Sequence, residues 1–176
     1  MLLVVAATEK ELSSVEGAET LCCGIGPVEA AARTAAALAG RRPDAVLHIG
    51  LAGARGIEPP TLVLGSESVY EDARGPLVPS RLEPDAALLA AACRALPDAL
   101  VLPIGTSAHV GGTSVCDVEA MEGFAVLRAA QLAGVPALEL RAISNAVDEQ
   151  DRGAWRFDDA FAALAEALPR LIAALS

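Results

Sequence analysis

The segment from Asp117 to Asp148 constrains the fold more than any other part of this sequence. Its first half reads as a buried helix with Glu122 at its start, and a Gly-Val-Pro turn follows. Its second half, ALELRAIS, is a strand-like apolar run that stops at Asn145. Groups at the carboxyl end of a strand in an α/β sheet face the crevice in which ligands bind. We therefore expect Glu122 and Asn145 to converge on one small molecule.

Apolar strand-like runs alternate with helical segments in the rest of the chain. Strands are expected at 2–7, 44–49, 61–73 and 100–104, and helices at 27–40, 84–96 and 158–176. Pro169 is expected to kink or divide the last helix. This alternation predicts a layered α/β sandwich. No repeat or linker interrupts the 176 residues, so a single domain over 1–176 is expected.

The charge and hydropathy of the chain argue against two classes of partner. The formal net charge is -10 and no run is rich in Lys or Arg, which argues against nucleic-acid binding. No uninterrupted apolar run reaches the length of a membrane span. The opening MLLVVAATEKE lacks the basic segment of a signal peptide and fits a first strand better.

The four cysteines suggest no metal or redox site. Cys22, Cys23, Cys93 and Cys116 form no CxxC pair and have no His beside them, so neither zinc nor a disulfide-exchange motif is indicated. Buried free thiols are the simpler interpretation. They indicate a reducing compartment, and a cytoplasmic location is expected.

Two polar segments follow apolar runs near the start of the chain. Thr8 to Glu11 comes directly after the first strand and is either part of a site or a capping box that opens a helix. The loop Gly24-Ile25-Gly26-Pro27 precedes a helix, where glycine lets a backbone N–H approach a ligand closely, although most such loops are only tight turns. His48 lies within a strand and is expected to be a core histidine.

Five ordered motifs resemble the nucleoside phosphorylase/nucleosidase family. They are ATEKE, GIGPVEAA, HIGLAGA, the MEG of EAMEGFAV, and GVPALELRAISNAVD. MEG followed by RAISN and DRGAW most resembles the futalosine hydrolases within that family. The resemblance implies a three-layer αβα sandwich with a mixed central sheet. The chain is shorter than typical members, chiefly between Val15 and Thr20, where the family has extra strands.

The resemblance also implies roles for the catalytic candidates. It places a ribose over Met121, with Glu122 accepting hydrogen bonds from both ribose hydroxyls, although Glu122 could instead be a helix N-terminal acid. Glu11 matches the water-activating carboxylate, and Glu9 is the competing candidate. Asn145 stands where adenine-specific nucleosidases have an aspartic acid that donates a proton to the base. An amide has no proton to transfer, so Asn145 favours hypoxanthine as the leaving base, although it could also pair with adenine or merely end the strand.

Further residues are assigned to substrate binding in the same way. Leu51 replaces a hydroxyl residue that helps phosphorylases hold phosphate, which favours water as the nucleophile. The resemblance places Ala108, His109 and Val110 along the purine pocket, and Gly26 belongs to the glycine loop. Futalosine carries a benzoate, which Arg152 could pair with and Trp155 could cover. The alternative for these two residues is a surface loop anchored by one Trp.

These expectations define a leading function and its alternatives. The leading hypothesis is hydrolysis of futalosine to hypoxanthine and dehypoxanthine futalosine in menaquinone biosynthesis, without metal or organic cofactor. The alternatives are a methylthioadenosine/S-adenosylhomocysteine nucleosidase or related purine nucleosidase, a phosphorylase, and a nucleoside-binding protein on the same scaffold. The family also implies a homo-oligomer, a dimer or tetramer, with the Pro-rich segment from Arg74 to Pro84 as a candidate contact.

Overall fold

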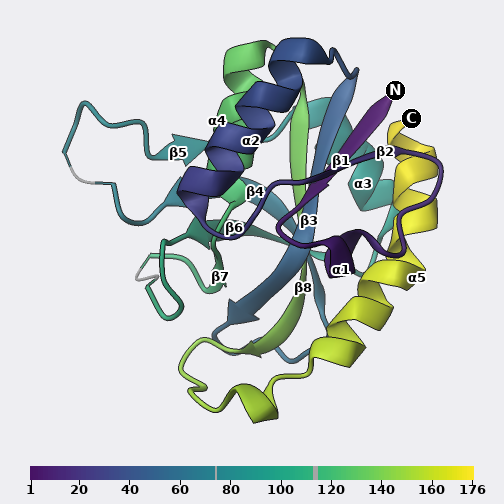
Figure 1. The fold of residues 1–176 in the computed structure, drawn as a ribbon. Helices are drawn as coiled ribbons and strands as arrows, with labels where there is room; N and C mark the ends of the chain where they lie inside the picture. Colours follow the sequence, from purple (N-terminus) through teal and green to yellow (C-terminus); the bar gives the residue numbers. More distant parts are fainter. Residues whose placement is uncertain (74, 113–114) are drawn as a thin grey trace.

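The computed structural model describes residues 1–73, 75–112 and 115–176, and in this part of the chain eight strands form one mixed sheet with helices on both faces (Figure 1). The strands are β1 (Leu2–Ala6), β2 (Glu19–Cys22), β3 (Ala45–Ala54), β4 (Leu62–Tyr70), β5 (Arg81–Leu82), β6 (Leu100–Thr106), β7 (Val118–Ala120) and β8 (Ala137–Ala146). The helices are α1 (Glu9–Leu12), α2 (Pro27–Gly40), α3 (Ala86–Ala95), α4 (Gly123–Ala133) and α5 (Phe157–Leu175), with a 3-10 turn at Arg152–Ala154.

The sheet is partly closed on itself. Its strand order is β2-β1-β3-β7-β6-β4-β5, and β8 pairs with both β3 and β4. The path from β3 through β7, β6, β4 and β8 therefore returns to β3. Strands β1, β3 and β8 run parallel to one another, so their carboxyl ends lie at the same end of the molecule.

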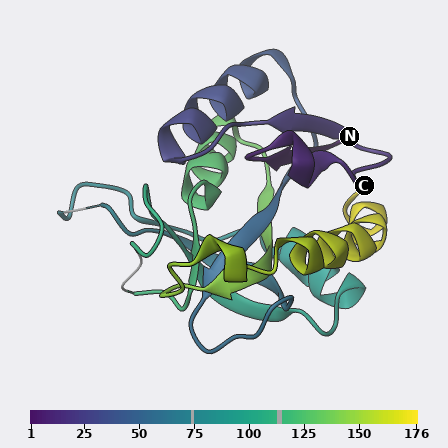
Figure 2. The same ribbon diagram turned by 60° about the horizontal axis from the view of Figure 1, so that its bottom comes forward.

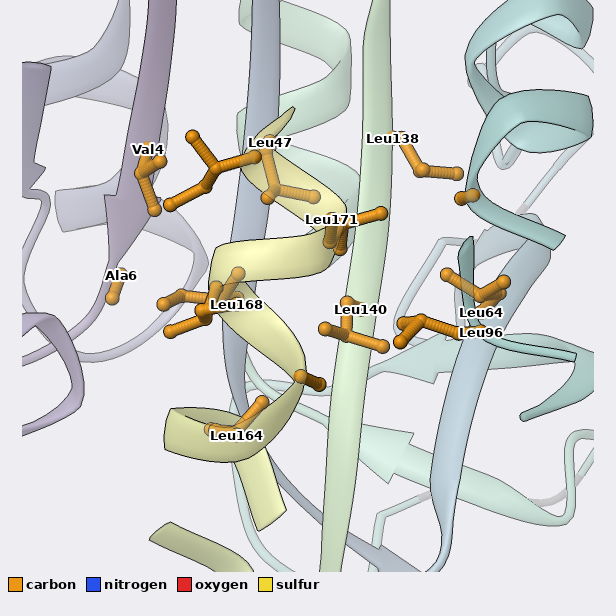
Figure 3. Packing of buried hydrophobic residues seen from close by; sticks show 14 of the residues in the cluster. Val4, Ala6, Leu47, Leu64, Leu96, Leu138, Leu140, Leu164, Leu168 and Leu171 are labelled. Atoms are coloured by element: carbon orange, nitrogen blue, oxygen red, sulfur yellow. The ribbon is translucent and has the colours of Figure 1, made fainter. Parts of the chain in front are cut away.

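Helices cover the sheet in two groups (Figure 2). Helices α2 and α4 lie together on one side, and α5 lies with α3 on the other. Leucines of α5 pack on the apolar face of β1, β3 and β8, as Leu164, Leu168 and Leu171 do around Leu47 and Leu140 (Figure 3). Burial of each such side chain stabilises the fold by roughly 1.5–3 kcal/mol. This packing confirms the predicted α/β layers.

Some expected elements differ from the structure. The segment 118–120, predicted as the start of a helix, is instead strand β7, and α4 begins only at Gly123. The reason is tertiary pairing, because this short segment is buried between β3 and β6. Pro169 does not divide α5, which is one continuous helix. Strand β2 begins at Glu19, within the shortened segment, and pairs with β1.

The prediction of a single domain stays a prediction. Among the described helices, none combines the length and the apolar composition needed to cross a lipid bilayer.

Candidate active site

A cavity of about 270 Å³ opens where β1, β3 and β8 end. It brings together side chains that are far apart in the sequence, from the ends of strands, from α1 and from α5. Its lining is Ala7, Thr8, Glu11, Ile25, Leu51, Ala52, Gly53, Val110, Glu119, Ala120, Met121, Glu122, Ser144, Asn145, Trp155, Phe157 and Phe161. All three predicted catalytic candidates lie in this set.

Glu11 reaches the cavity because a capping box fixes its side chain. The backbone N–H and hydroxyl of Thr8 both donate to Glu11 Oε2, at 2.8 and 2.7 Å. The N–H of Leu51 donates to Oε1 at 3.3 Å. Capping and participation in a site were alternatives in the sequence; the structure shows the capping box, and the same carboxylate lines the cavity. Glu9, the competing candidate, is exposed and does not line the cavity.

Glu122 occupies the turn between β7 and α4. Its side chain makes no capping bond to the helix; instead, Oε1 accepts a hydrogen bond from Gly26 N at 2.9 Å. Burial raises the pKa of Glu122, while the Arg141 guanidinium and the Gly26 hydrogen bond oppose that rise. Gly26, predicted to bind substrate, does not line the cavity; its backbone N–H is bonded to the carboxylate of Glu122, which does.

A β-bulge sets the direction in which the Asn145 side chain points. The pairing of β3 with β8 shifts between Ala52 and Gly53, so that Ser144 is an extra residue on β8. A bulge reverses the alternation of side chains and redirects them locally. Asn145 therefore pairs directly with Gly53, on the face opposite to that of Arg141.

Arg141 is the principal residue that the sequence analysis missed. It is only 1% exposed and lies under the cavity, where its Nε donates to Glu139 Oε1 at 2.8 Å. Its Nη1 lies 3.9 Å from Glu122 Oε2. Such a buried cation stabilises carboxylates beside it, but only while its own partners hold it. The signal in the sequence was a pair of charges two residues apart in an otherwise apolar strand.

His48 completes this buried network and is the core histidine that was predicted. Its Nδ1 lies 2.9 Å from the carbonyl oxygen of Val5, and its Nε2 contacts Arg141 Nη2. Burial, and then repulsion by Arg141, lowers the pKa of His48 well below 6.5. The imidazole is therefore neutral, with Nδ1–H donating to Val5 and Nε2 accepting from Arg141.

The predicted binding residues fall into two groups. Leu51, Met121, Val110 and Trp155 line the cavity. Ala108, His109 and Arg152 do not, and all three are exposed. The backbone N–H of Ala108 is bonded to Asp72, and the His109 ring lies 3.4 Å from Ser107 Oγ. For the residues of both groups, the roles in substrate binding stay predictions.

Aromatic side chains gather at the mouth of the cavity. The chain has three Phe, one Trp and one Tyr, and Trp155, Phe157 and Phe161 all line the mouth. The mouth continues into an open hollow that also contains Lys10, Arg152 and Arg156. Lys10 Nζ lies 4.5 Å from the centre of the Phe161 ring, and the Arg152 guanidinium lies 5.6 Å from that of Trp155. The sequence analysis did not predict Phe157, Phe161 or Lys10 as site residues.

Within the described ranges, no group of three His, Cys, Asp or Glu side chains is arranged to hold a metal ion. The cysteines in this part of the chain are free thiols, and burial raises the pKa of Cys23 to about 12. The cavity offers the carboxylates of Glu11, Glu119 and Glu122 and the amide of Asn145.

Comparison with known proteins identifies the class of protein that this fold and cavity define. The phosphorylase superfamily model matches residues 19–117 and 108–176, and the chain belongs to that superfamily. A futalosine hydrolase of Streptomyces coelicolor is 36% identical over 186 residues, which cover 89% of this chain and 79% of that protein. A 5'-methylthioadenosine/S-adenosylhomocysteine nucleosidase of Actinobacillus succinogenes is 31% identical over 153 residues, covering 71% and 66%.

Solved structures share the fold at lower sequence identity. Futalosine hydrolase of Helicobacter pylori superposes with a TM-score of 0.85 at 16% identity, covering 98% of this chain and 97% of that one. A methylthioadenosine/S-adenosylhomocysteine nucleosidase of Colwellia psychrerythraea, in complex with adenine, superposes with a TM-score of 0.84 at 19% identity. The superposition covers 99% of this chain and 95% of that one. At these identities the likeness establishes the fold alone.

Proposed function

We propose that this chain hydrolyses the N-glycosidic bond of futalosine and releases hypoxanthine. The observation that carries the proposal is the shared cavity, in which Glu11, Glu122 and Asn145 meet from three distant parts of the chain. The 36% identical futalosine hydrolase supports this choice of substrate.

Glu122 would hold the ribose and stabilise the transition state. Breaking the bond between ribose C1′ and purine N9 develops positive charge on the sugar ring. A carboxylate that accepts both ribose hydroxyls faces this charge, and such preorganised electrostatic stabilisation is a large part of catalysis. Arg141 keeps a countercharge 3.9 Å from Glu122, which opposes the effect of burial on that carboxyl group.

Glu11 would be the general base. As water adds to C1′, its proton passes to the Glu11 carboxylate, and the electron pair of the broken bond leaves with the base. Thr8 and Leu51 hold the carboxylate in place, and Leu51 offers no hydroxyl for a phosphate ion. This arrangement favours water over phosphate as the nucleophile.

The hollow beside the cavity would receive the substituent on the ribose 5′ carbon. It offers a ring-stacking surface in Trp155 and cations in Lys10 and Arg152, which suit an aromatic carboxylate such as the benzoate of futalosine. Two nearby acidic side chains reduce the positive charge of this hollow. Arg156 is paired with Asp159 at 2.7 Å, and Lys10 lies 3.9 Å from Asp158. Among the described residues, Arg152 forms no ion pair.

A methylthioadenosine or S-adenosylhomocysteine nucleosidase is the second candidate. The 31% identical nucleosidase favours it, because that relative also spans most of this chain. Purified chain incubated with futalosine, inosine and methylthioadenosine, each with and without phosphate, separates the candidates. We expect hypoxanthine from futalosine without phosphate, identified by its ultraviolet spectrum. Adenine released from methylthioadenosine alone, or strict dependence on phosphate, contradicts the proposal.

A cytoplasmic homo-oligomer is also part of the proposal. Ile25, which lines the cavity, is 64% exposed, and Leu77 in the Pro-rich segment is 93% exposed. Arg74, at the start of that segment, lies outside the described residues. A second copy that buried Ile25 would cover the cavity at that side chain, and sedimentation velocity at several concentrations tests for such a copy.

A further inference from the structure

Glu139 and Arg141 form an ion pair beneath the cavity, on one face of β8. They are two residues apart in this strand, so their side chains project from the same face. In the register with β3, Glu139 lies opposite His48. Arg141 lies opposite Gly50. The side chains of both charged residues are 1% exposed, so protein groups rather than water surround the two charges.

Two glycines make room for the carboxylate of Glu139. At Gly123, the first residue of α4, an added Cβ atom would overlap both of its oxygens, and at Gly65 of β4 it would lie 3.4 Å from Glu139 Cβ. The carboxylate therefore lies against the start of α4, where the helix dipole favours negative charge. Its Oε1 accepts from Arg141 Nε at 2.8 Å, whereas Oε2 has no hydrogen-bond partner among the described residues.

The other end of the guanidinium lies beside both carboxylates that we assign to catalysis. Nη1 of Arg141 is 3.9 Å from Glu122 Oε2. A Cβ atom added at Gly50 would overlap Nη1 and would lie 2.8 Å from Glu11 Oε1, so Nη1 and this oxygen approach the same point. The guanidinium is planar and rigid, so a bond at Nε also sets where Nη1 points. The bond to Glu139 thus orients the positive charge relative to both carboxylates.

Stability alone gives a poor account of this ion pair. Replacing a buried ion pair by apolar side chains of similar volume is often neutral or stabilising. A buried carboxylate oxygen without a donor, as Oε2 of Glu139 is within the described residues, adds a further cost. What distinguishes the position of the pair is its proximity to Glu11 and Glu122.

We infer that Glu139 is a positioning residue for the hydrolysis, and that its hydrogen bond to Arg141 Nε holds the guanidinium beside the two catalytic carboxylates. The inference rests on the proposed function for the roles of these carboxylates. Glu122 must be ionised to accept both ribose hydroxyls and to face the positive charge that develops on the sugar. Burial raises the pKa of Glu122, and Arg141 is the strongest of the influences that lower it. A guanidinium that turned away would let burial favour the protonated, inactive form.

Two substitutions separate the charge of Glu139 from its hydrogen bond. Glu139→Gln keeps an oxygen that accepts from Arg141 Nε and removes the negative charge. Glu139→Met has a similar volume and removes both. After burial, the charge of Arg141 is the strongest influence on the pKa of Glu122 and lowers it, whereas the weaker influence of Glu139 raises it. The two variants should therefore move the titration of Glu122 in opposite directions.

NMR titration of ¹³C-labelled glutamate carboxyl groups, with Glu122→Gln to assign the signal, tests this inference without requiring turnover. In Glu139→Gln the midpoint for Glu122 should move to lower pH by about 0.5 or more, because a nearby negative charge is lost. In Glu139→Met it should move to higher pH by about 0.5 or more, because the guanidinium is no longer held. The same midpoint in both variants, or in Glu139→Gln and the unmodified chain, overturns the inference.

Rates supply a second readout, on whichever of futalosine, inosine and methylthioadenosine the unmodified chain hydrolyses. The kcat of Glu139→Gln should stay within about tenfold, whereas Glu139→Met should lose about 100-fold because the guanidinium is misplaced. Raising the pH should restore part of that loss, since Glu122 then ionises, and a purely structural loss would not respond in this way. Glu19→Gln is the matched control and should change neither readout, because Glu19 pairs with Arg41 at the opposite end of the strands.

The outcomes separate this inference from the proposed function. Equal losses of kcat in both Glu139 variants contradict positioning, because glutamine retains the bond. If none of the three nucleosides is hydrolysed, the proposed function fails, and the carboxyl titration still decides the inference. An unchanged titration alongside hydrolysis of futalosine refutes only the inference. If the variants do not fold, the Nε–H signal of Arg141 in the unmodified chain decides: it should exchange slowly with solvent, and exchange as fast as in an exposed arginine contradicts the bond to Glu139.

Discussion

Arg141 and Glu122 face each other under the cavity, with 3.9 Å between Nη1 of the guanidinium and Oε2 of the carboxylate. Glu139 and His48 hold the other two guanidinium nitrogens. A charge buried this deeply is tolerated only with such partners. The arrangement supplies a fixed cation beside the carboxylate that we assign to the ribose.

The first prediction separates Glu11 from its neighbour Glu9. Glu11→Gln should lower kcat for futalosine by about 100- to 10,000-fold, because the general base is lost. The fold should persist, since glutamine also completes a capping box. Glu9→Gln is the matched control, and its kcat should stay within about twofold of the unmodified chain, because surface substitutions have small effects. The reverse ranking in steady-state assays would assign the base to Glu9.

The second prediction concerns two glycines at which substitution by alanine should change the stability of the fold in opposite directions. A Cβ at Gly50 would overlap the Arg141 guanidinium and the Glu11 carboxylate, so Gly50→Ala should destabilise the fold by about 1–3 kcal/mol. At Gly40, the last residue of α2, a Cβ meets nothing within 4 Å. Gly40→Ala should be neutral or stabilise by up to about 1 kcal/mol. Urea unfolding measures both, and equal effects would refute the packing described at Gly50.

The third prediction is a dependence of stability on pH that arises from His48. Its pKa in the folded chain is well below 6.5, so as the pH falls through about 6.5 the unfolded chain binds a proton that the folded chain does not. The contribution is fully present above that pH. Below it, the unfolding free energy should decrease by up to about 1.4 kcal/mol per pH unit.

Variants of the two histidines isolate this effect. Between about pH 7 and 5.5, His48→Gln should lose the slope while its amide oxygen still accepts from Arg141. The exposed His109 is the control, and His109→Asn should keep the slope. The raised pKa of Glu122 has the opposite sign, because stability falls as the pH rises from about 4.5 towards that pKa. Subtracting the unfolding free energy of the unmodified chain from that of each variant at the same pH cancels the contribution of Glu122. A slope that persists in His48→Gln would refute the assignment.

The fourth prediction tests the hollow beside the cavity. Trp155→Leu should raise KM for futalosine by about tenfold, which corresponds to about 1.4 kcal/mol of lost contact with an aromatic substituent. Inosine lacks that substituent, so its KM should change much less. Equal increases for both substrates would place Trp155 against the base or the ribose instead.

The sequence predicted the fold class and the meeting of Glu11, Glu122 and Asn145 because each lies where an apolar run ends or a helix begins. It did not predict β7, since three residues are too few to show alternation and only pairing with β3 and β6 makes them a strand. Arg141 was missed for a related reason. Its partner His48 is 93 residues away, so only the register of β3 against β8 reveals the network.

Exposure limits the predictions for His109 and Arg152. His109 lies in a loop and Arg152 in the 3-10 turn between β8 and α5, and the conformation of such connections depends little on local sequence patterns. The bulge at Ser144 could not be predicted either, although it decides which face Asn145 occupies. The pairing of Gly53 with Glu119 likewise appears only once β7 is placed beside β3.

Turnover of futalosine in water enriched with ¹⁸O, without phosphate, tests the central claim most directly. If Glu11 activates water at C1′, mass spectrometry should find one ¹⁸O in the sugar product and none in the released hypoxanthine. No turnover, or turnover only with phosphate to give a sugar phosphate without the label, would contradict the account.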